Sequence, residues 1–371
     1  MIDGARYSET FGDSMHTYIP KMWNLLSEGT LIDSFYNDSL TSTRYAHPAL
    51  WCGCWTEVPD TVYNGSWTIY MKEPTIFEYF RKQKNMSCDE CFYVLKYHPV
   101  LWLQSFHPSY GPNYWPHSHS AGYNDYDVAT QTEWVMDTYH PRFIWTYLTG
   151  VDDAGHSGVW SNYLNAIQIG DSIVGRLWNK IQSDSFYHNS TYLFVTNDHG
   201  RHDDLHGGFT NHGCGCEGCR HILFLSLGPN IKSHNVSSQY RCIPDLAVTI
   251  SAIFGLNPEC ATGDVMEEIF ENSLSVSSDK FLLPVRPYLS QNYPNPFNPS
   301  TTIAFDLPKT SEVSLKVLNI LGEEVATLIS ASLLSGSHSV EWDAGNLASG
   351  VYLYRLETEG YIETKKMILM K

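Results

Sequence analysis

The sequence predicts an α/β domain with a mainly parallel sheet flanked by helices, followed by a small immunoglobulin-like β-sandwich. Three observations support this prediction. The chain has 371 residues, enough for about two or three domains. Short apolar runs alternate with helical stretches in its first part, whereas only short alternating runs occur near its end. A proline-rich stretch separates the two parts.

The strands expected in the first part are near-continuous apolar and aromatic runs, as is usual for buried parallel strands. They cover residues 92–97, 143–148, 192–196 and 222–227. The clearest helix is 160–182, where apolar residues recur at spacings of three, four and seven. In sheets of this kind, active groups collect where strands end and loops begin, so those positions are searched first.

The domain boundary is expected near residues 284–290, because 283–287 and 293–299 contain too many prolines for a helix or a central strand. We therefore expect a first domain over 1–283, a linker over 284–290 and a second domain over 291–371. Alternating runs at 302–305, 313–318, 339–342, 351–356 and 366–370 predict its antiparallel strands.

The composition excludes several classes of protein. A 43% hydrophobic and 14% aromatic content is incompatible with a disordered chain. No uninterrupted apolar run approaches the roughly 20 residues of a transmembrane helix. The formal charge of −17 would repel nucleic-acid phosphates, so no nucleic-acid partner is expected. All Cys, and all His except His338, lie in the first part, where metal chemistry is therefore expected.

Three clusters of potential metal ligands lie at predicted strand ends or helix starts. Carboxylates and imidazoles together suit Zn²⁺ or a similar cation. Each cluster alone is compatible with an ordinary turn, and their joint occurrence is what suggests a site. The clusters are Asp3-Gly4-Ala5-Arg6, Asp152-Asp153-Ala154-Gly155-His156, and Asp198-His199-Gly200, the last followed by His206, His212 and His221.

A candidate nucleophile lies in the segment 41–50. The hydroxyl of Thr43 is expected at a helix N-terminus, where the helix dipole and the neighbouring Arg44 favour its alkoxide. The alternative is a threonine that only caps the helix.

Four motifs in this order resemble the alkaline phosphatase superfamily, especially its nucleotide pyrophosphatase/phosphodiesterase-like and threonine-nucleophile phosphatase members. They are Asp3-Gly4-x-Arg6, Thr43-x-x-x-His47, Asp152-x-x-Gly155-His156 and Asp198-His199-Gly200. The resemblance covers roughly residues 1–275 and leaves the substrate open. Thr43-Arg44-Tyr45-Ala46 lacks the Cys/Ser-x-Pro/Ala-x-Arg motif of the sulfatases in this superfamily.

The resemblance implies two Zn²⁺ ions, or other divalent cations, and Thr43 as the nucleophile. Asp3, Asp198 and His199 would hold the zinc beside Thr43. Asp152 and His156 would hold the second zinc with one further histidine. In the family that histidine precedes a strand ending in Gly-Pro, which favours His212, with His206 in reserve and His221 less favoured.

Phosphate-binding residues are suggested by the same resemblance. Asn64 lies where the diesterase-like members place an asparagine on the phosphate, and Lys96, at the end of its strand, is a weaker candidate. Arg201 and Arg220 could add positive charge, although surface positions are expected for both.

The N-terminus departs from the family pattern. A buried strand precedes the first aspartate in the family, whereas only Met1 and Ile2 precede Asp3. We therefore expect a missing first strand, as in a truncated gene model or a processed fragment, and a poorly anchored Asp3.

Nine cysteines occur mostly in close pairs. The groups are Cys52-x-Cys54, Cys88-x-x-Cys91 and Cys214-x-Cys216-x-x-Cys219, with Cys242 and Cys260 apart. They indicate either disulfides of an exported protein, which we favour, or thiolate ligands of a structural metal.

Residues 288–371 resemble the C-terminal sorting domain of type IX secretion. The resemblance rests on Gln291-Asn292-Tyr293-Pro294-Asn295-Pro296, on the run 349–356 and on the basic end 365–371. It implies the secretion machinery as a partner and a secreted or cell-surface location. The alternative is an immunoglobulin-like spacer or carbohydrate-binding module.

Taken together, these features predict an exported two-metal hydrolase of phosphate esters that acts through a phospho-threonine. One alternative is a phosphodiesterase or nucleotide pyrophosphatase rather than a monoesterase. Another is a surface binding protein that has lost catalysis. The leaving group would be read by loops such as 98–140, whose aromatic residues could instead form a packed lid. Those residues are His107, Tyr110, Trp115, His117 and His119.

Overall fold

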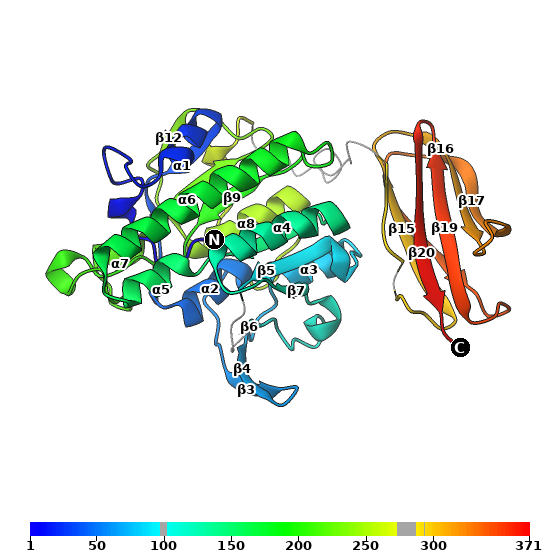
Figure 1. Cartoon of the computed structure of the whole chain (residues 1–371), viewed down its shortest axis with the longest axis horizontal. Coiled ribbons are helices and arrows are strands. Elements are labelled where there is room, and N and C mark those ends of the chain that lie inside the picture. The colour runs from blue at the N-terminus through cyan, green and yellow to red at the C-terminus, as the bar shows by residue number, and fades with distance from the viewer. Residues whose placement is uncertain (97–101, 273–286, 293) are drawn as a thin grey trace. The chain divides into compact units, whose positions relative to one another are not determined.

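The chain forms two compact units, Met1–Val276 and Ser277–Lys371, in a computed structural model that describes residues 1–96, 102–272, 287–292 and 294–371. Helices and strands alternate in the first unit, and the second contains strands (Figure 1). Residues 284–286 of the expected linker lie outside the described residues. Its last part does not behave as a linker, because β14 (Tyr288–Leu289) pairs with β15 (Ser300–Leu307) of the second unit.

The main sheet of the first unit consists of two groups of strands. In one, the order is β12 (Asn235–Ser237), β1 (Gly29–Ile32), β11 (Phe224–Leu227) and β9 (Leu193–Thr196). In the other, it is β7 (His117–Ser120), β5 (Cys91–Leu95) and β8 (Phe143–Tyr147). The N-terminus connects the groups, because Ile2 forms a parallel bridge to Leu148 and donates its N–H to the carbonyl of Thr196 at 2.9 Å.

The strand directions confirm the predicted α/β fold. Strands β7, β5 and β8 are parallel to one another, and β1 is parallel to β12. The exception is β11, which runs antiparallel to both β1 and β9. All four apolar runs expected in this unit contain strands of the sheet, with ends shifted by at most two residues.

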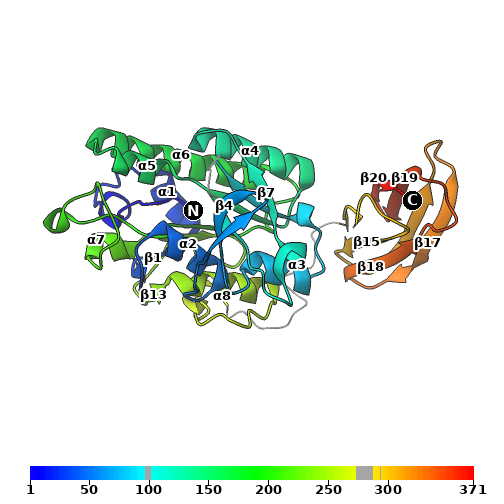
Figure 2. The same cartoon turned by 90° about the horizontal axis from the view of Figure 1, so that it is seen from below.

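Helices cover both faces of this sheet (Figure 2). On one face lie α4 (Asp125–Tyr139), α5 (Gly150–His156) and α6 (Trp160–Ser183), with α1 (Pro20–Leu25) packed against α6. On the other lie α2 (Thr43–Cys52), α3 (Ile76–Gln83) and α8 (Ile243–Phe254). Strand side chains alternate accordingly: Phe92 joins the core under α4 and α6, whereas the Tyr93 ring contacts Trp51 on the opposite face.

Smaller elements surround this layered core. One small sheet contains β2 (Phe35–Tyr36), β10 (His221–Ile222) and β13 (Arg241–Cys242). Another contains β3 (Asp60–Tyr63), β4 (Ser66–Tyr70) and β6 (Trp102–Leu103). A short helix, α7 (Glu217–Arg220), precedes β10. Single 3₁₀ turns occur at Tyr7–Glu9, Leu26–Glu28, Cys88–Glu90, Gly111–Tyr114, Asp204–His206 and Glu267–Ile269.

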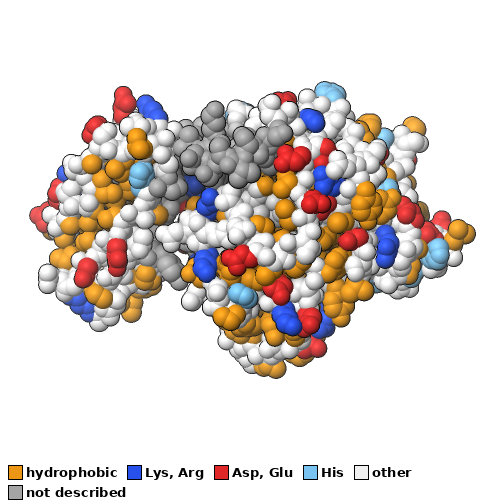
Figure 3. Space-filling model, turned by 180° about the vertical axis from the view of Figure 1, so that it is seen from behind, with side chains coloured by type: hydrophobic (Ala, Val, Ile, Leu, Met, Phe, Trp, Pro, Cys, Tyr) orange, Lys and Arg blue, Asp and Glu red, His pale blue; other side chains and the backbone are white. Residues whose placement is uncertain are grey.

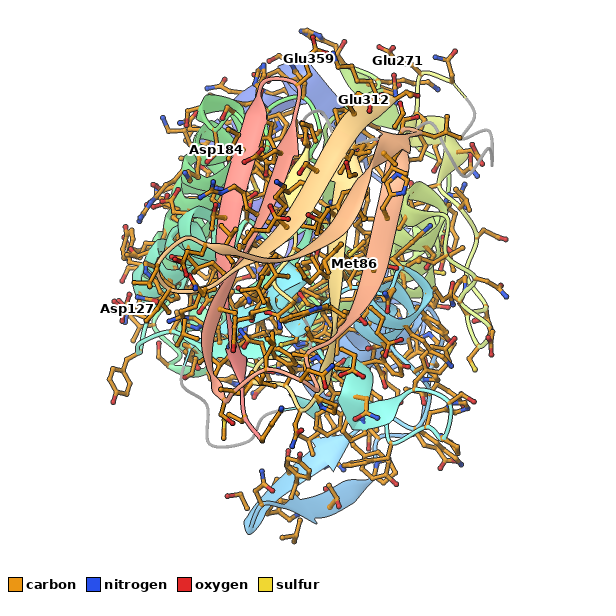
Figure 4. All side chains as sticks on the ribbon, turned by 90° about the vertical axis from the view of Figure 1, so that its right-hand side faces the viewer. Met86, Asp127, Asp184, Glu271, Glu312 and Glu359 are labelled. Carbon is orange, nitrogen blue, oxygen red and sulfur yellow. The ribbon has the colours of Figure 1, made fainter. Side chains whose placement is uncertain are left out.

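The second unit is the predicted antiparallel β-sandwich. One sheet has the order β14, β15, β18 (Gly336–Asp343), and the other has the order β17 (Glu324–Leu333), β16 (Ser311–Leu318), β19 (Gly350–Thr358), β20 (Tyr361–Leu369). Its core includes Phe305, Val317, Trp342 and Tyr354. Glu312, near the start of β16, and Glu359, in the turn after β19, mark the same end of the second sheet (Figure 4).

The surface of the first unit carries no single-sign patch on the face shown in Figure 3, where acidic and basic side chains are interspersed with hydrophobic ones. Within the described ranges, no helix has both the length and the apolar character needed to cross a bilayer.

Candidate active site

The predicted ligand residues come from segments that begin where strands of the main sheet end. Asp3 follows the bridge made by Ile2, and its N–H donates to the carbonyl of Leu148 just after β8. Asp152 and His156 lie on α5, a helix that begins two residues after Leu148. Asp198 and His199 follow β9 after one intervening residue, Asn197. These positions agree with the rule that groups gather at the carboxyl ends of strands.

A first cluster is formed by Asp3, Asp198 and His199, whose side chains are buried. The Nε2 of His199 lies 3.5 Å from Asp3 Oδ1 and 3.5 Å from Asp198 Oδ2. These two carboxylate oxygens are buried and have no hydrogen-bond partner among the described residues. A buried carboxylate oxygen without a donor is costly, and a bound cation would satisfy both oxygens at once.

A second cluster is formed by Asp152, His156 and His212. The Nε2 atoms of His156 and His212 are 3.2 Å apart. Asp152 Oδ2 is 3.3 Å from His156 Nε2, and Asp152 Oδ1 is 3.6 Å from His212 Nε2. Ligands bound tetrahedrally at about 2.1 Å to one zinc ion are about 3.4 Å apart, so the separations in both clusters fit a shared cation.

Two of the imidazoles are oriented by backbone carbonyls. His199 Nδ1 lies 2.8 Å from the carbonyl oxygen of Gly200, and His212 Nδ1 lies 3.0 Å from that of Thr41. A neutral imidazole that donates from Nδ1 keeps a lone pair on Nε2, the atom that faces the carboxylates here. The two rings stack with centroids 3.9 Å apart, so the clusters are adjacent.

Thr43 is the first residue of α2, and its side chain reaches the first cluster. Its Oγ1 is 2.9 Å from His199 Nε2. Ser42 is the N-cap residue, with extended backbone and no side-chain capping bond. The Thr43 hydroxyl is therefore directed at the cluster rather than used as the cap, and it lies at the positive end of the helix dipole.

The electrostatics of the clusters also favour cations. Burial raises the pKa of Asp3 well above its usual range, and the negative charges of Asp198 and Asp152 raise it further. Burial, together with the nearby His199, lowers the pKa of His212 to about 4. His212 is therefore neutral near pH 7, as a metal ligand must be, and the crowded carboxylates need a neutralising charge.

The anchoring of Asp3 corrects an expectation drawn from the sequence. Asp3 is 2% exposed, and the hydroxyl of Tyr147 donates to its Oδ2 at 2.5 Å. The backbone of Met1–Asp3 is held by hydrogen bonds to residues at the ends of β8 and β9. Asp3 is thus fixed in place, because Met1 and Ile2 are hydrogen-bonded to residues at the ends of β8 and β9.

Arg201 is also placed differently from the expectation. It is fully buried rather than at the surface, and its guanidinium donates to the carbonyl and to Oδ1 of Asp152. It also donates to the carbonyls of Phe209 and Thr210, at 3.1 and 3.0 Å. Arg201 therefore connects α5 to the loop that leads to His212. Arg220 is half-buried at the end of α7.

Several predicted residues lie outside the two clusters. Asn64 sits at the exposed tip of the β3–β4 hairpin with a φ of 50°, where Asn64-Gly65 forms the turn. Lys96 pairs with Asp153, beside Asp152. His206 pairs with Asp203 at 2.6 Å, and His221 contacts the carbonyl of Asp33 at 2.6 Å.

The aromatic loop residues pack among themselves. The buried Tyr110 contacts the ring of Tyr79, Trp115 Nε1 donates to the carbonyl of Ser105 at 2.8 Å, and His117 pairs with Asp89. This agrees with the packed-lid alternative for the described part of 98–140; residues 98–101 lie outside it.

Sequence reasoning missed three residues that orient the ligands. Tyr147 donates to Asp3, and Asn197 donates from Nδ2 to the carbonyls of Ala5 and His199. The carboxylate of Asp125, at the start of α4, accepts the N–H groups of Thr149 and Gly150 at the start of α5. Asn197 could have been noticed from its place between β9 and Asp198, whereas nothing in the sequence indicates the other two pairings.

Comparisons with known families find a similarity in each unit. Residues 117–240 match the model of the Metalloenzyme superfamily, a range that includes Asp152, His156, Asp198, His199 and His212. Residues 291–370 match the model of the secretion system C-terminal sorting domain. Part of the first unit is therefore similar to the alkaline-phosphatase-like metalloenzyme superfamily, and the second unit is similar to secretion sorting domains.

Solved structures similar to this chain share its fold at low sequence identity. Murine ectonucleotide pyrophosphatase/phosphodiesterase 5 has a TM-score of 0.53 at 14% identity, covering 73% of this chain and 98% of its own. An inactive form of that protein in complex with AMP gives 0.55 at 13%, with the same coverage. No curated protein sequence matches the chain.

Two other hydrolases have similar folds. Phosphonate monoester hydrolase from Silicibacter pomeroyi gives a TM-score of 0.52 at 11% identity, covering 99% of this chain and 87% of its own. A 2-O glycosaminoglycan sulfatase gives 0.53 at 12%, covering 93% and 84%. The fold of this chain is therefore one on which ester hydrolases are built, and its own reaction must be argued from its site.

Proposed function

We propose that the first unit is a two-metal hydrolase of phosphate esters that acts through a phospho-threonine at Thr43. The observation that carries the proposal is the pair of adjacent ligand clusters, with the Thr43 hydroxyl 2.9 Å from His199 Nε2 in the first. Carboxylate, imidazole and hydroxyl groups, which together suit metal-assisted hydrolysis, meet at one edge of the sheet. No structural need explains that meeting, since it leaves two buried carboxylate oxygens without donors.

The metal ligands in this proposal are Asp3, Asp198 and His199 for the cation beside Thr43, and Asp152, His156 and His212 for the other. Two divalent cations, proposed as Zn²⁺, would offset the carboxylate charge, lower the pKa of the hydroxyl and stabilise the attacking and leaving oxygens of an in-line displacement. His212 is preferred to His206 because its Nε2 is 3.2 Å from that of His156, whereas His206 is exposed and paired with Asp203.

The reaction would proceed in two displacements at phosphorus. The Thr43 Oγ attacks the phosphoryl group, the bond to the ester oxygen breaks, and an alcohol leaves while the phosphoryl group stays on Thr43. Water then attacks the phospho-threonine, releasing phosphate and regenerating the hydroxyl. The N-terminal end of α2 offers its dipole to the negative charge that gathers beside Thr43.

A phosphate ester is favoured over a sulfate ester because the residue at the nucleophile position is a threonine, and the sulfatase motif is absent from 43–46. Phosphodiesterase or nucleotide pyrophosphatase activity is the second candidate. The fold similarity to a murine protein solved with AMP supports it, whereas Asn64, exposed at a hairpin tip, gives it no further support. Lys96, paired with Asp153 beside the second cluster, remains the proposed phosphate-binding residue.

The sorting domain extends the proposal to location. A secretion system C-terminal sorting domain implies recognition by secretion machinery and a secreted or cell-surface enzyme. A surface binding protein without catalysis is the rival reading, and it is tested by the same experiment as the hydrolase.

The experiment measures metal content by mass spectrometry, together with hydrolysis of p-nitrophenyl phosphate and bis-p-nitrophenyl phosphate. The variants are Thr43→Ala and, as a matched control on the same helix start, Ser42→Ala, whose hydroxyl makes no capping bond. We expect turnover that Ser42→Ala keeps and Thr43→Ala loses. The preferred ester distinguishes monoesterase from diesterase. Bound metal without turnover of either ester would instead support the binding protein.

A further inference from the structure

A second group of potential metal ligands lies outside the candidate active site, in the segment that follows His199. It consists of His202, Cys214, Cys216 and Cys219, which we name the Cys–His cluster. The ligand atoms of His202, Cys214 and Cys219 all lie within 4.8 Å of one another. Cys216 and Cys219 are buried, and all four residues belong to the first unit.

The distance between the sulfur atoms distinguishes a metal site from a disulfide. Cys214 Sγ and Cys219 Sγ are 3.8 Å apart, whereas a disulfide bond is about 2.05 Å long. Two thiolates bound tetrahedrally at about 2.3 Å to one zinc ion are about 3.8 Å apart. All nine cysteines of the chain are free thiols in the structure, so the disulfides favoured from the sequence are not formed.

His202 directs an unused nitrogen at these thiols. Its Nε2 is buried and has no hydrogen-bond partner among the described residues, which is costly unless something binds it. Its backbone is fixed on both sides, because its N–H donates to the carbonyl of Asn211 at 2.8 Å and its carbonyl accepts from Arg6 at 3.0 Å. The backbone from which the imidazole projects is therefore held in place.

Cys216 is the proposed fourth ligand. Its N–H donates to Cys214 Sγ at 3.4 Å, and its ligand atom lies within 4.8 Å of those of Asp203 and His206. The Cys216-Glu217-Gly218-Cys219 turn is closed by a hydrogen bond from the N–H of Cys219 to the carbonyl of Cys216 at 3.1 Å. A Cys-x-x-Cys turn with a backbone N–H on a ligand sulfur is suited to a structural zinc site.

We infer that the chain binds a structural zinc ion through His202, Cys214, Cys216 and Cys219, in addition to the cations of the candidate active site. Three thiolates and one imidazole make a closed tetrahedral site with no open position for a substrate. Binding would replace the thiol protons, which are released to solvent, and satisfy His202 Nε2. This inference does not depend on the proposed hydrolase activity.

The Cys–His cluster lies directly behind residues of the candidate active site, so a zinc ion there would support that site. The carbonyl of Cys219 accepts the N–H of Gly200 at 2.9 Å, and the carbonyl of Cys214 accepts from Thr41 Oγ1 at 2.8 Å. The backbones are so close that a Cβ on Gly200 would lie 2.0 Å from the carbonyl oxygen of Gly218. Since Thr41 also holds His212, a zinc here would stiffen the support behind His199 and His212.

The test uses the full chain loaded with Co²⁺ or Zn²⁺ and reads metal binding rather than activity. Thiolate ligation gives cobalt a charge-transfer band in the near ultraviolet, which carboxylate and imidazole ligands do not. We expect that band in the wild type and in Asp198→Asn, which removes a ligand of the active-site cluster. Cys214→Ser/Cys219→Ser should lose it together with one zinc per chain. Cys242→Ser/Cys260→Ser is the control that should keep both.

Two results would overturn the inference. One is a wild-type chain, purified with reductant, that shows no thiolate band. The other is a disulfide between cysteines of the Cys–His cluster that persists in the zinc-loaded protein. Such a disulfide would be detected by mass spectrometry as cysteine peptides that resist alkylation. If the double serine variant does not fold, release of zinc from the wild type by a mercurial thiol reagent decides, because only a thiolate-bound ion is released. Loss of hydrolysis with an intact band would count against the proposed function alone.

Discussion

Thr43 Oγ1 lies 2.9 Å from Nε2 of His199, and that same nitrogen lies 3.5 Å from one carboxylate oxygen each of Asp3 and Asp198. The hydroxyl and the three proposed ligands thus converge on one point. This relationship separates two roles for Thr43, because a threonine that only capped α2 would direct its oxygen to backbone N–H groups.

The first prediction concerns the side chain that supplies the hydroxyl. Thr43→Ala should reduce hydrolysis by at least about 10³-fold, because the covalent step is lost, whereas Thr43→Ser keeps the oxygen and should retain measurable turnover. Acid quenching during turnover, followed by peptide mass spectrometry, should find phosphate on residue 43 in the wild type. Thr43 would be ruled out as the nucleophile if the phosphate were found on another residue. It would also be ruled out if neither the wild type nor Thr43→Ser carried phosphate during turnover.

The second prediction concerns the charge of Asp3. The pKa of this carboxyl is raised by burial and by Asp198 and Asp152, so its ionised form is unfavourable when no cation is present. Asp3→Asn, which can still accept from Tyr147, should therefore raise the Tm of the chelator-treated protein. It should also remove most of the Tm increase that zinc gives the wild type. Calorimetry with and without zinc measures both changes, and an equal zinc effect in the two proteins would contradict the ligand role.

Much of this architecture could be predicted because it depends on local pattern. The four apolar runs and the helix at 160–182 are visible from hydrophobic spacing alone. Strand β17 was missed because it is an edge strand whose side chains are mostly exposed, so the run 324–333 shows no regular alternation.

The site was predictable only where ligand types stand next to strand ends. Asp152, Asp198 and His199 are such residues, whereas the partners of Arg201 and Tyr147 depend on which strands become neighbours. Arg201 was expected at the surface because a charged residue usually is, and its burial depends on Asp152 and on two carbonyls distant in sequence. For Asn64, the spacing from Thr43 predicts a phosphate contact, whereas Asn64-Gly65 is also a turn signal, and the structure shows the turn.

The third prediction concerns Gly155, in the motif that carries Asp152 and His156. A Cβ at this position would lie 2.1 Å from Nε of Arg201, whose guanidinium is fixed by four hydrogen bonds to α5 and the loop before His212. Gly155→Ala should therefore destabilise the protein by about 1–3 kcal/mol and weaken zinc binding at the second cluster. Urea unfolding and zinc titration measure these effects. Unchanged stability would mean that Arg201 does not occupy the place described.

The fourth prediction concerns pH and the pair of His117 with Asp89, whose Nδ1 and Oδ1 are 3.1 Å apart. The hydrogen bond to Asp89 raises the pKa of His117 to about 9, so the folded state favours the protonated imidazole. Its contribution to stability is fully present below the unfolded value of about 6.5 and is lost as the pH rises through about 9. His117→Gln should therefore lower the urea midpoint relative to the wild type at pH 6, and this difference should shrink by pH 10. A difference that stays constant over that range would show that His117 contributes by packing against Phe92 and not by its charge.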